Sequence, residues 1–184
     1  LVIRMQGVLT KLQRELGITF VYVTHSQSEA FAMADRVVIM SKGEIAQLGS
    51  ARDIYRTPAN RFVAEFVGRN NIFSGSVNAQ GAVETPAGVF ELDSRARPGE
   101  QVSFVVAADV VSLSTTRPAA RNVFSGQLIS EEFVGSMVTL FFETADGMEV
   151  KLQMQERLLE GIPREPGQQL FLSFDPSHAH VLKG

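Results

Sequence analysis

The chain has 184 residues, 45% of them hydrophobic, and its 17 Lys and Arg against 20 Asp and Glu give a formal net charge of −3. This composition is that of a globular protein with a sizeable core, and it excludes a disordered, highly charged chain. It also argues against a dominant nucleic-acid-binding or anionic-membrane surface. The absence of Cys excludes disulfides, Cys-ligated zinc and thiol catalysis. Because no apolar run approaches the roughly 20 residues of a membrane helix and no signal peptide opens the chain, we expect a soluble, cytoplasmic protein.

The first segment is predicted to be a helix that ends at Gly17, where glycine adopts the left-handed conformation of a helix C-terminus. The chain starts with Leu1 rather than Met, and no N-cap residue precedes the helix. We therefore expect the sequence to be a piece of a longer protein. The apolar residues that recur at helical spacing are Leu1, Met5, Val8, Leu9, Leu12 and Leu16.

A mixed α/β pattern continues to residue 69. Residues 18–23, Ile-Thr-Phe-Val-Tyr-Val, predict a strand buried on both faces of a parallel sheet. The capping-box pattern Ser26-Gln-Ser-Glu29 predicts a helix from Gln27 to about Ala34. A β-hairpin is predicted around Gly43, followed by two short helices with Ser50 and Asn60 as N-caps.

From about residue 70 the hydrophobic period changes from 3.6 to 2, which predicts a small β-barrel or sandwich. We place the domain boundary near Gly68-Arg-Asn-Asn71, giving domains of residues 1–69 and 70–184. The predicted strands are Phe73–Val77, Val89–Leu92, Val102–Val106, Phe124–Ile129, Val138–Phe142, Val150–Met154 and Leu170–Phe174.

The β half contains two pairs of similar segments, which occur in the same order in each copy. Asn71-Ile-Phe-Ser-Gly-Ser-Val77 matches Asn122-Val-Phe-Ser-Gly-Gln-Leu128, and Pro98-Gly-Glu-Gln-Val102 matches Pro166-Gly-Gln-Gln-Leu170. One interpretation is a duplicated β unit that builds one closed architecture. The other is that Asn-x-Phe-Ser-Gly is only a favourable turn at the start of a strand.

His25 is the candidate functional residue, because it directly follows a buried-type strand and precedes a helix N-terminus. This edge of an open α/β sheet is where ligands bind, and the free N–H groups of a helix N-terminus favour anions. An imidazole there could hydrogen-bond a phosphate oxygen. The alternative is a histidine that only bonds a neighbouring carbonyl at the end of a strand.

Motifs along most of the chain resemble the end of an ABC-transporter nucleotide-binding domain, in particular that of bacterial importers for polyamines, ferric iron and sugars. The β half resembles the C-terminal TOBE region of these importers, an OB-like barrel. The matching stretches are Ile18-Thr-Phe-Val-Tyr-Val-Thr-His25, Glu29-Ala30, Ala34-Asp-Arg-Val-Val-Ile-Met40, Lys42-Gly43-Glu44, Gly49, Pro58-Ala-Asn-Arg-Phe-Val-Ala-Glu-Phe-Val-Gly68, Phe174-Asp-Pro and His180-Val-Leu182.

The resemblance implies an α+β chain: the C-terminal end-piece of a P-loop (RecA-like) α/β nucleotide-binding domain, followed by an all-β, OB-like barrel of TOBE type. It identifies His25 as the switch (H-loop) histidine on the γ-phosphate side of bound ATP. The sequence contains no Gly-x-x-x-x-Gly-Lys-Ser/Thr loop, no apolar strand ending in Asp-Glu and no Leu-Ser-Gly-Gly signature. We therefore expect ATP and Mg²⁺ to be bound by the complete subunit, and no cofactor to be bound by this chain alone.

The resemblance also implies partners and a location. The family's subunit pairs with a second copy of itself and drives membrane permease subunits, so that it is cytoplasmic and peripheral to the inner membrane. No nucleic acid and no direct membrane insertion are expected, and polyamine or ferric iron import is favoured over sugar import. The alternative function is that of a free-standing TOBE-type barrel that binds a small oxyanion or a partner protein.

Two departures from the family pattern affect these expectations. In relatives the switch histidine is usually followed by Asp-Gln-Glu-Glu, whereas in this chain it is followed by Ser26-Gln-Ser-Glu29. The difference removes one carboxylate near the phosphate region. Relatives often carry Arg-Pro-Glu where this chain has Ala107-Ala-Asp109, so no role of that Arg can be transferred.

The remaining candidates are interpreted as structural. His178 and His180 would face the same side of a strand, but two ligands without a carboxylate or thiolate partner make a poor site, so no metal site is expected. The 13 Phe are assigned to the core rather than to a base-stacking platform. Adjacent Glu131 and Glu132 point to opposite faces of a strand and are assigned to the solvated surface.

Overall fold

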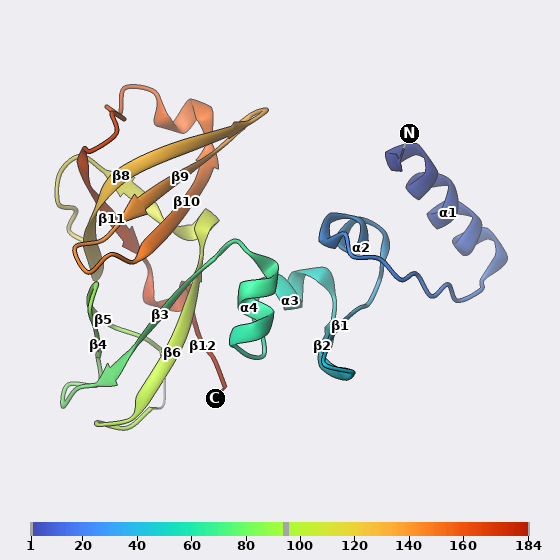
Figure 1. The fold of residues 1–184 in the computed structure, drawn as a ribbon, viewed down its shortest axis with the longest axis horizontal. Coiled ribbons are helices and arrows are strands. Elements are labelled where there is room, and N and C mark those ends of the chain that lie inside the picture. The colour runs from blue at the N-terminus through green and yellow to red at the C-terminus, as the bar shows by residue number, and fades with distance from the viewer. Residues whose placement is uncertain (1, 94–95, 184) are drawn as a thin grey trace. The chain divides into compact units, whose positions relative to one another are not determined.

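A computed structural model describes residues 2–93 and 96–183 of the chain. The chain divides into two compact units between Pro58 and Ala59 (Figure 1). The sequence had placed the boundary after residue 69. The difference lies in one short helix (Arg61–Val67), which packs on the β strands that follow it.

The first unit contains three helices and one hairpin. The opening helix ends as predicted, because Gly17 has a φ of 64° and its N–H bonds to the carbonyl of Gln13 at 3.0 Å. In the hairpin turn Lys42 and Gly43 have φ values of 51° and 84°, the two positive angles that match a two-residue turn to the twist of its strands. The elements are α1 (Val2–Leu16), α2 (Gln27–Met33), β1 (Val37–Ser41), β2 (Glu44–Gly49) and α3 (Ala51–Arg56).

The strand predicted for residues 18–23 is absent, and this expectation was wrong. The segment forms no ladder with any other described part of the chain. Val21 and Val23 are 89% and 90% exposed. A β-branched and aromatic run provides strand propensity, but a strand exists only where a neighbour accepts its backbone hydrogen bonds and covers its side chains. No described residue does so here.

The second unit is built on two five-stranded sheets (Figure 1). The seven predicted strands are all present, and the sequence did not predict three short strands, β4, β7 and β12. The first sheet has the order β12-β6-β3-β4-β5 and the second β10-β9-β8-β11-β7. The strands are β3 (Asn70–Val77), β4 (Val83–Thr85), β5 (Gly88–Phe90), β6 (Gln101–Ala107), β7 (Ser112–Ser114), β8 (Asn122–Val134), β9 (Met137–Glu143), β10 (Glu149–Gln155), β11 (Gln169–Phe174) and β12 (Ala179–Val181).

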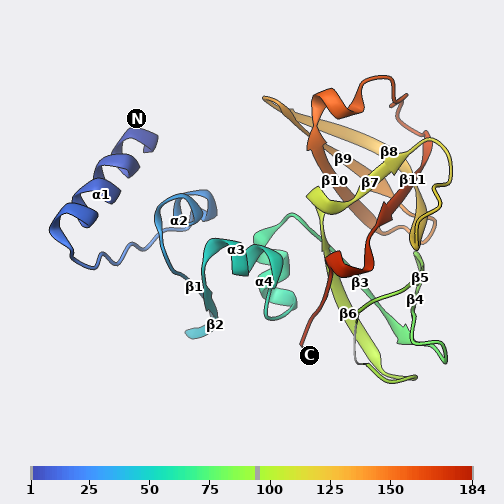
Figure 2. The ribbon, with the colours of Figure 1, turned by 180° about the vertical axis from the view of Figure 1, so that it is seen from behind.

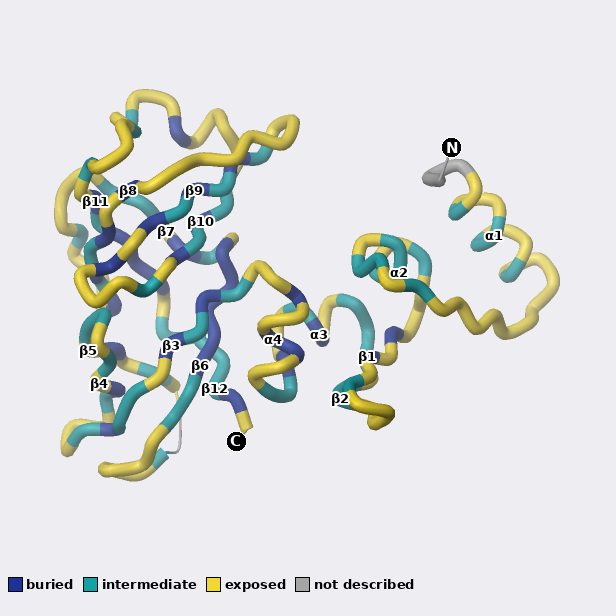
Figure 3. Tube along the Cα trace, in the orientation of Figure 1, coloured by how far each residue is buried: buried dark blue, intermediate teal, exposed yellow. Residues whose placement is uncertain are grey.

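These sheets do not join into a closed hydrogen-bonded barrel within the described residues, which corrects the expectation of an OB-like barrel. The core lies between them, where the buried segments of the strands meet in Figure 3. Phe73 stacks on Phe104 with ring centroids 5.1 Å apart and meets Phe90 edge-on at 5.2 Å. As predicted, most of the strand phenylalanines are core residues; those in the buried cluster are Phe73, Phe90, Phe104, Phe124, Phe142 and Phe174.

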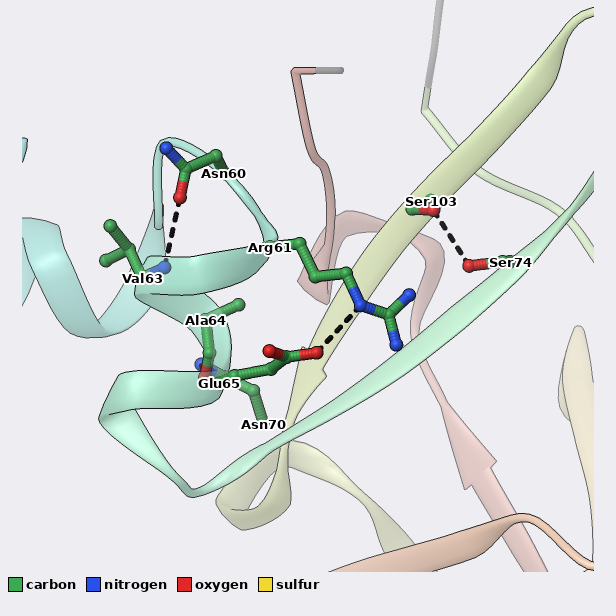
Figure 4. A network of polar contacts seen from close by, with 8 residues as sticks. All are labelled: Asn60, Arg61, Val63, Ala64, Glu65, Asn70, Ser74 and Ser103. Carbon is green, nitrogen blue, oxygen red and sulfur yellow. Dashed lines mark hydrogen bonds and ion pairs between the residues drawn. The ribbon is translucent and has the colours of Figure 1, made fainter. Parts of the chain in front are cut away.

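Helix α4 (Arg61–Val67) covers the outer face of the first sheet. Asn60 accepts a hydrogen bond from Val63 N–H at 3.0 Å, as the sequence predicts, and Gly68 ends the helix with a φ of 75° (Figure 4). Buried Ala64 packs with Val105 and Leu182. This contact is the reason why α4 belongs to the β unit.

The register of the two sheets supports the duplicated unit. In the first sheet Gly75 lies opposite Val102, and in the second Gly126 lies opposite Leu170. Gly75 and Gly126 are equivalent positions in the first pair of similar segments, and Val102 and Leu170 are equivalent positions in the second. Both glycines sit close to the next strand: a Cβ at Gly75 would collide with the carbonyl oxygen of Glu84, and one at Gly126 would lie 3.0 Å from the Cβ of Phe142.

The two halves also exchange their last strands. After β6 the chain turns through the 3₁₀ helix η1 (Ala108–Val110), and β7 then pairs with β11 of the second sheet. After β11 it turns through η3 (Pro176–His178), and β12 pairs with β6 of the first sheet (Figure 2). Each half therefore completes the sheet of the other.

Two buried asparagine amides bridge the sheets where no ladder connects them. Asn71 of β3 donates to the carbonyl of Lys151 at 2.8 Å and accepts its N–H at 2.7 Å, on the edge strand β10. Asn122 of β8 donates to the carbonyl of Glu91 at 2.9 Å and accepts its N–H at 2.8 Å, just beyond the edge strand β5. The two asparagines are 2% and 0% exposed.

We expect Asn122→Ala to lower the free energy of unfolding by about 1–3 kcal/mol, because it removes the buried amide that satisfies both the N–H and the carbonyl of Glu91. Asn122→Asp should also destabilise, since a carboxylate cannot donate to that carbonyl. Urea unfolding measures both losses. The control is Gln101→Ala, at an exposed strand position, with an expected change of about 0.5 kcal/mol or less. An equally small loss in Asn122→Ala would contradict the bridging role.

Candidate functional site

His25 lies in the bend between the extended residues 18–24 and helix α2. Its side chain is exposed. Within the residues that the structure describes, the imidazole has no hydrogen-bond or ion-pair partner. The structure therefore does not show the carbonyl contact of the purely structural alternative, and the imidazole is accessible to a ligand.

The backbone around His25 is held by the side chains of its neighbours. The hydroxyl of Thr24 accepts the N–H of Ser26 at 3.0 Å and donates to Oε2 of Glu29 at 2.8 Å. Tyr22 donates its hydroxyl to the same carboxylate oxygen at 3.0 Å. The hydroxyl of Ser26 accepts the N–H of Glu29 at 3.4 Å and thereby caps α2.

The capping box predicted for this helix is only half formed. Ser26 acts as the N-cap, as expected. In a complete box the carboxylate of Glu29 would bond to the N–H of Ser26, but that N–H is bonded to Thr24 and the carboxylate takes two hydroxyls instead. The sequence analysis missed Tyr22 and Thr24 as functional candidates; two hydroxyl residues at alternate positions before His25 were the available signal.

Glu29 raises the pKa of Tyr22 above its ordinary value. The main cause is the hydrogen bond from the phenol to the carboxylate, and partial desolvation and repulsion from the negative charge of Glu29 act in the same direction. The hydrogen bond from Thr24 acts weakly in the opposite direction. The phenol therefore stays protonated, and stays a donor, to higher pH than a free tyrosine.

The described part of the chain does not provide a group of ligands for a metal ion or a full set of contacts for nucleotide phosphates. Among residues 2–93 and 96–183, no group of three or more His, Cys, Asp or Glu is placed to hold a metal. Helix α2 has seven residues, too short to act as a phosphate cradle alone. The exposed imidazole of His25 suits one contact to a phosphate oxygen, but Mg²⁺ and the remaining phosphate contacts do not fit the residues present.

The other candidate residues from the sequence do not form a site: the two histidines lie in different elements, and one of the two glutamates forms an ion pair. His178 ends η3 whereas His180 belongs to β12, so they do not share the face of one strand. Glu131 forms an ion pair with Arg164 at 3.2 Å, and Glu132 is exposed. No described helix is both long and apolar enough to cross a membrane.

Comparison with known proteins identifies the β unit first. Residues 110–182 match the family model of the TOBE domain. The fold is similar to that of the cytoplasmic molybdate-binding protein ModG in its molybdate-bound crystal form, with a TM-score of 0.56 and 19% identity over 62% of this chain and 96% of that one. At this identity the likeness concerns the fold alone.

Relatives extend the comparison to the whole chain. The spermidine/putrescine import ATP-binding protein PotA of Frankia alni is 35% identical over 97% of this chain and 42% of its own length. PotA of Acetivibrio thermocellus is 37% identical over 97% of this chain and 48% of its own length. The chain thus spans about half the length of these relatives and aligns with their C-terminal part, which confirms the resemblance to ABC-transporter ATP-binding subunits.

The hydrogen bond between Tyr22 and Glu29 predicts a measurable titration. In Tyr55→Phe, Tyr22 is the remaining one of the chain's two tyrosines, and its phenolate absorbance should appear above the ordinary pKa of about 10. Adding Glu29→Gln should move the midpoint down toward that value. Because folding favours the protonated phenol, its contribution to stability is full below pH of about 10 and is lost as pH rises through the raised pKa. Identical midpoints in both variants would show that the bond does not form in solution.

Proposed function

We propose that this chain is the C-terminal part of the ATP-hydrolysing subunit of a bacterial polyamine importer, with His25 as its switch histidine. The observation that carries the proposal is the alignment of 97% of the chain with PotA proteins at 35% and 37% identity. Because it covers 97% of the chain, this alignment includes most of residues 1–69 as well as the β unit. It therefore favours a transporter subunit over the alternative of a free-standing TOBE-type domain that binds an oxyanion or a partner protein.

The complete subunit would supply what the chain lacks. Its Gly-rich loop and acidic strand would hold the phosphates and Mg²⁺, and residues 18–23 would join the parallel sheet of a RecA-like domain. The exposure of Val21 and Val23 supports this assignment, because β-branched side chains of this kind are normally covered. The functional domains would be residues 1–69, which end the nucleotide-binding domain, and residues 70–184, which form the regulatory TOBE domain.

In this assembly His25 would act by positioning. Hydrolysis of ATP requires the attacking water to lie in line with the γ-phosphate while charge builds up on the phosphate oxygens. An exposed imidazole held on a braced turn can contact a γ-phosphate oxygen and the attacking water together, and so reduce the entropy that must be lost at the transition state. The subunit would work as a homodimer on permease subunits at the cytoplasmic face of the inner membrane, with the TOBE domains stabilising the pair.

We expect His25→Ala in the complete subunit to lower the turnover of ATP by about 10²-fold or more, the order for loss of a group that positions or handles a proton. ATP affinity should change little, because the phosphate and Mg²⁺ contacts lie elsewhere. The thermal midpoint should also stay constant, since the imidazole is exposed and has no partner among the described residues.

The matched control is His178→Ala, which removes another exposed imidazole, from η3 of the β unit. Its turnover should equal that of the unmodified subunit. The assignment of His25 would be overturned by turnover that survives in His25→Ala together with a clear loss of stability. That result would make the residue part of the scaffold.

A further inference from the structure

The carboxylate of Glu29 connects the two sides of the bend that carries His25. Tyr22 and Thr24 precede His25, and Glu29 follows it in the first turn of α2. Both hydroxyls donate to the same atom, Oε2 of Glu29, at 3.0 and 2.8 Å. The extended segment before His25 and the helix after it are thereby held together through one side chain.

Capping of the helix does not explain this arrangement. The N-cap bond of α2 is made by the hydroxyl of Ser26, and the N–H of Ser26 is satisfied by Thr24. The carboxylate of Glu29 bonds to the two hydroxyls of the preceding segment rather than to the N–H that a capping box would use. Its contacts therefore serve the bend and not the end of the helix.

We propose that Glu29 is a positioning residue for His25, and that Thr24 and Tyr22 are the hydroxyl donors through which it acts. This inference rests on the proposed function of His25. The imidazole takes no part in the network, so the bend is fixed while the side chain stays available for its ligand. Hydrogen bonds to an ionised carboxylate are stronger than those between neutral groups, which suits them to hold this bend.

The geometry also defines which substitutions separate the possible roles. Thr24→Val keeps the shape of the side chain but removes both the acceptor for Ser26 N–H and the donor to Glu29. Thr24→Ser keeps the hydroxyl. Glu29→Ala removes the carboxylate, and Glu29→Gln keeps an oxygen that accepts hydrogen bonds without the charge.

The experiment measures ATP turnover, KM for ATP and thermal midpoint in the complete subunit. In Glu29→Ala and Thr24→Val we expect kcat to fall about 10-fold to 100-fold with KM within about twofold, because misplacement of a group by about 1 Å costs up to about 10²-fold. Thr24→Ser and Glu29→Gln should recover most of the loss. Glu15→Ala is the matched control, since this exposed helical carboxylate pairs with Lys11 at 3.7 Å on α1 and should leave turnover unchanged.

A double variant distinguishes positioning from a general structural role. If Glu29 acts through His25, Glu29→Ala should cause no further loss of turnover in a His25→Ala background. Losses that multiply, or a Glu29→Ala variant whose turnover per folded molecule is normal, would overturn the positioning role. Normal turnover in His25→Ala alone would instead refute the proposed function of His25.

A second measurement tests the network in this chain without any nucleotide. Hydrogen exchange at the N–H of Ser26, followed by NMR, should be about 10-fold or more faster in Thr24→Val than in Thr24→Ser, because only the former frees this N–H. Glu29→Ala should accelerate exchange at Ser26 in the same direction. Equal exchange in all variants would show that the bend does not depend on the carboxylate, and the inference would fail whatever the activity of the complete subunit.

Discussion

The two buried amides of Asn71 and Asn122 are the interactions on which the β unit depends. Each sheet has an edge with backbone groups that no strand pairs, and in both cases an asparagine of the other sheet satisfies one N–H and one carbonyl there. A closed ladder would do the same for a whole strand. Here one side chain on each side is sufficient, because burial makes an unpaired backbone group costly and a matched amide correspondingly favourable. The core between the sheets can therefore close without a barrel.

The two halves of the β unit carry different residues at equivalent positions of their sheets. On the outer face of the first sheet, Val105 and Leu182 lie under α4 and are buried. The positions that correspond to them in the second sheet are Ser173, which is buried, and Ser114, which is partly exposed. The equivalent positions of the two sheets therefore carry apolar side chains against α4 and hydroxyls in the second sheet.

Much of this structure could be predicted from the alternation of apolar and polar residues, from turn residues and from helix caps. These features are decided by residues that are close in sequence. The hairpin at Gly43, the caps at Ser50 and Asn60 and the seven predicted strands of the β unit are of this kind. Residues 18–23 were assigned to a strand because their side chains have high strand propensity. The prediction assumed a neighbouring strand, which the described residues do not provide. The hydrogen bonds from Tyr22 and Thr24 to Glu29 were missed for a related reason. The capping-box pattern specifies only residue types, whereas competition between nearby donors decides which hydrogen bonds the carboxylate of Glu29 accepts.

The exchange of end strands has a consequence for the order of synthesis. The first sheet needs β12 (Ala179–Val181) to cover the edge of β6, and the second needs β7, which is made long before β11 exists. A nascent chain that leaves the ribosome therefore carries β6 with an open edge until β12 has emerged, and β7 without a partner until β11 has emerged. The β unit cannot complete its fold before β12 has emerged, and during this interval its unpaired strands are open to chaperones or to other unfinished chains.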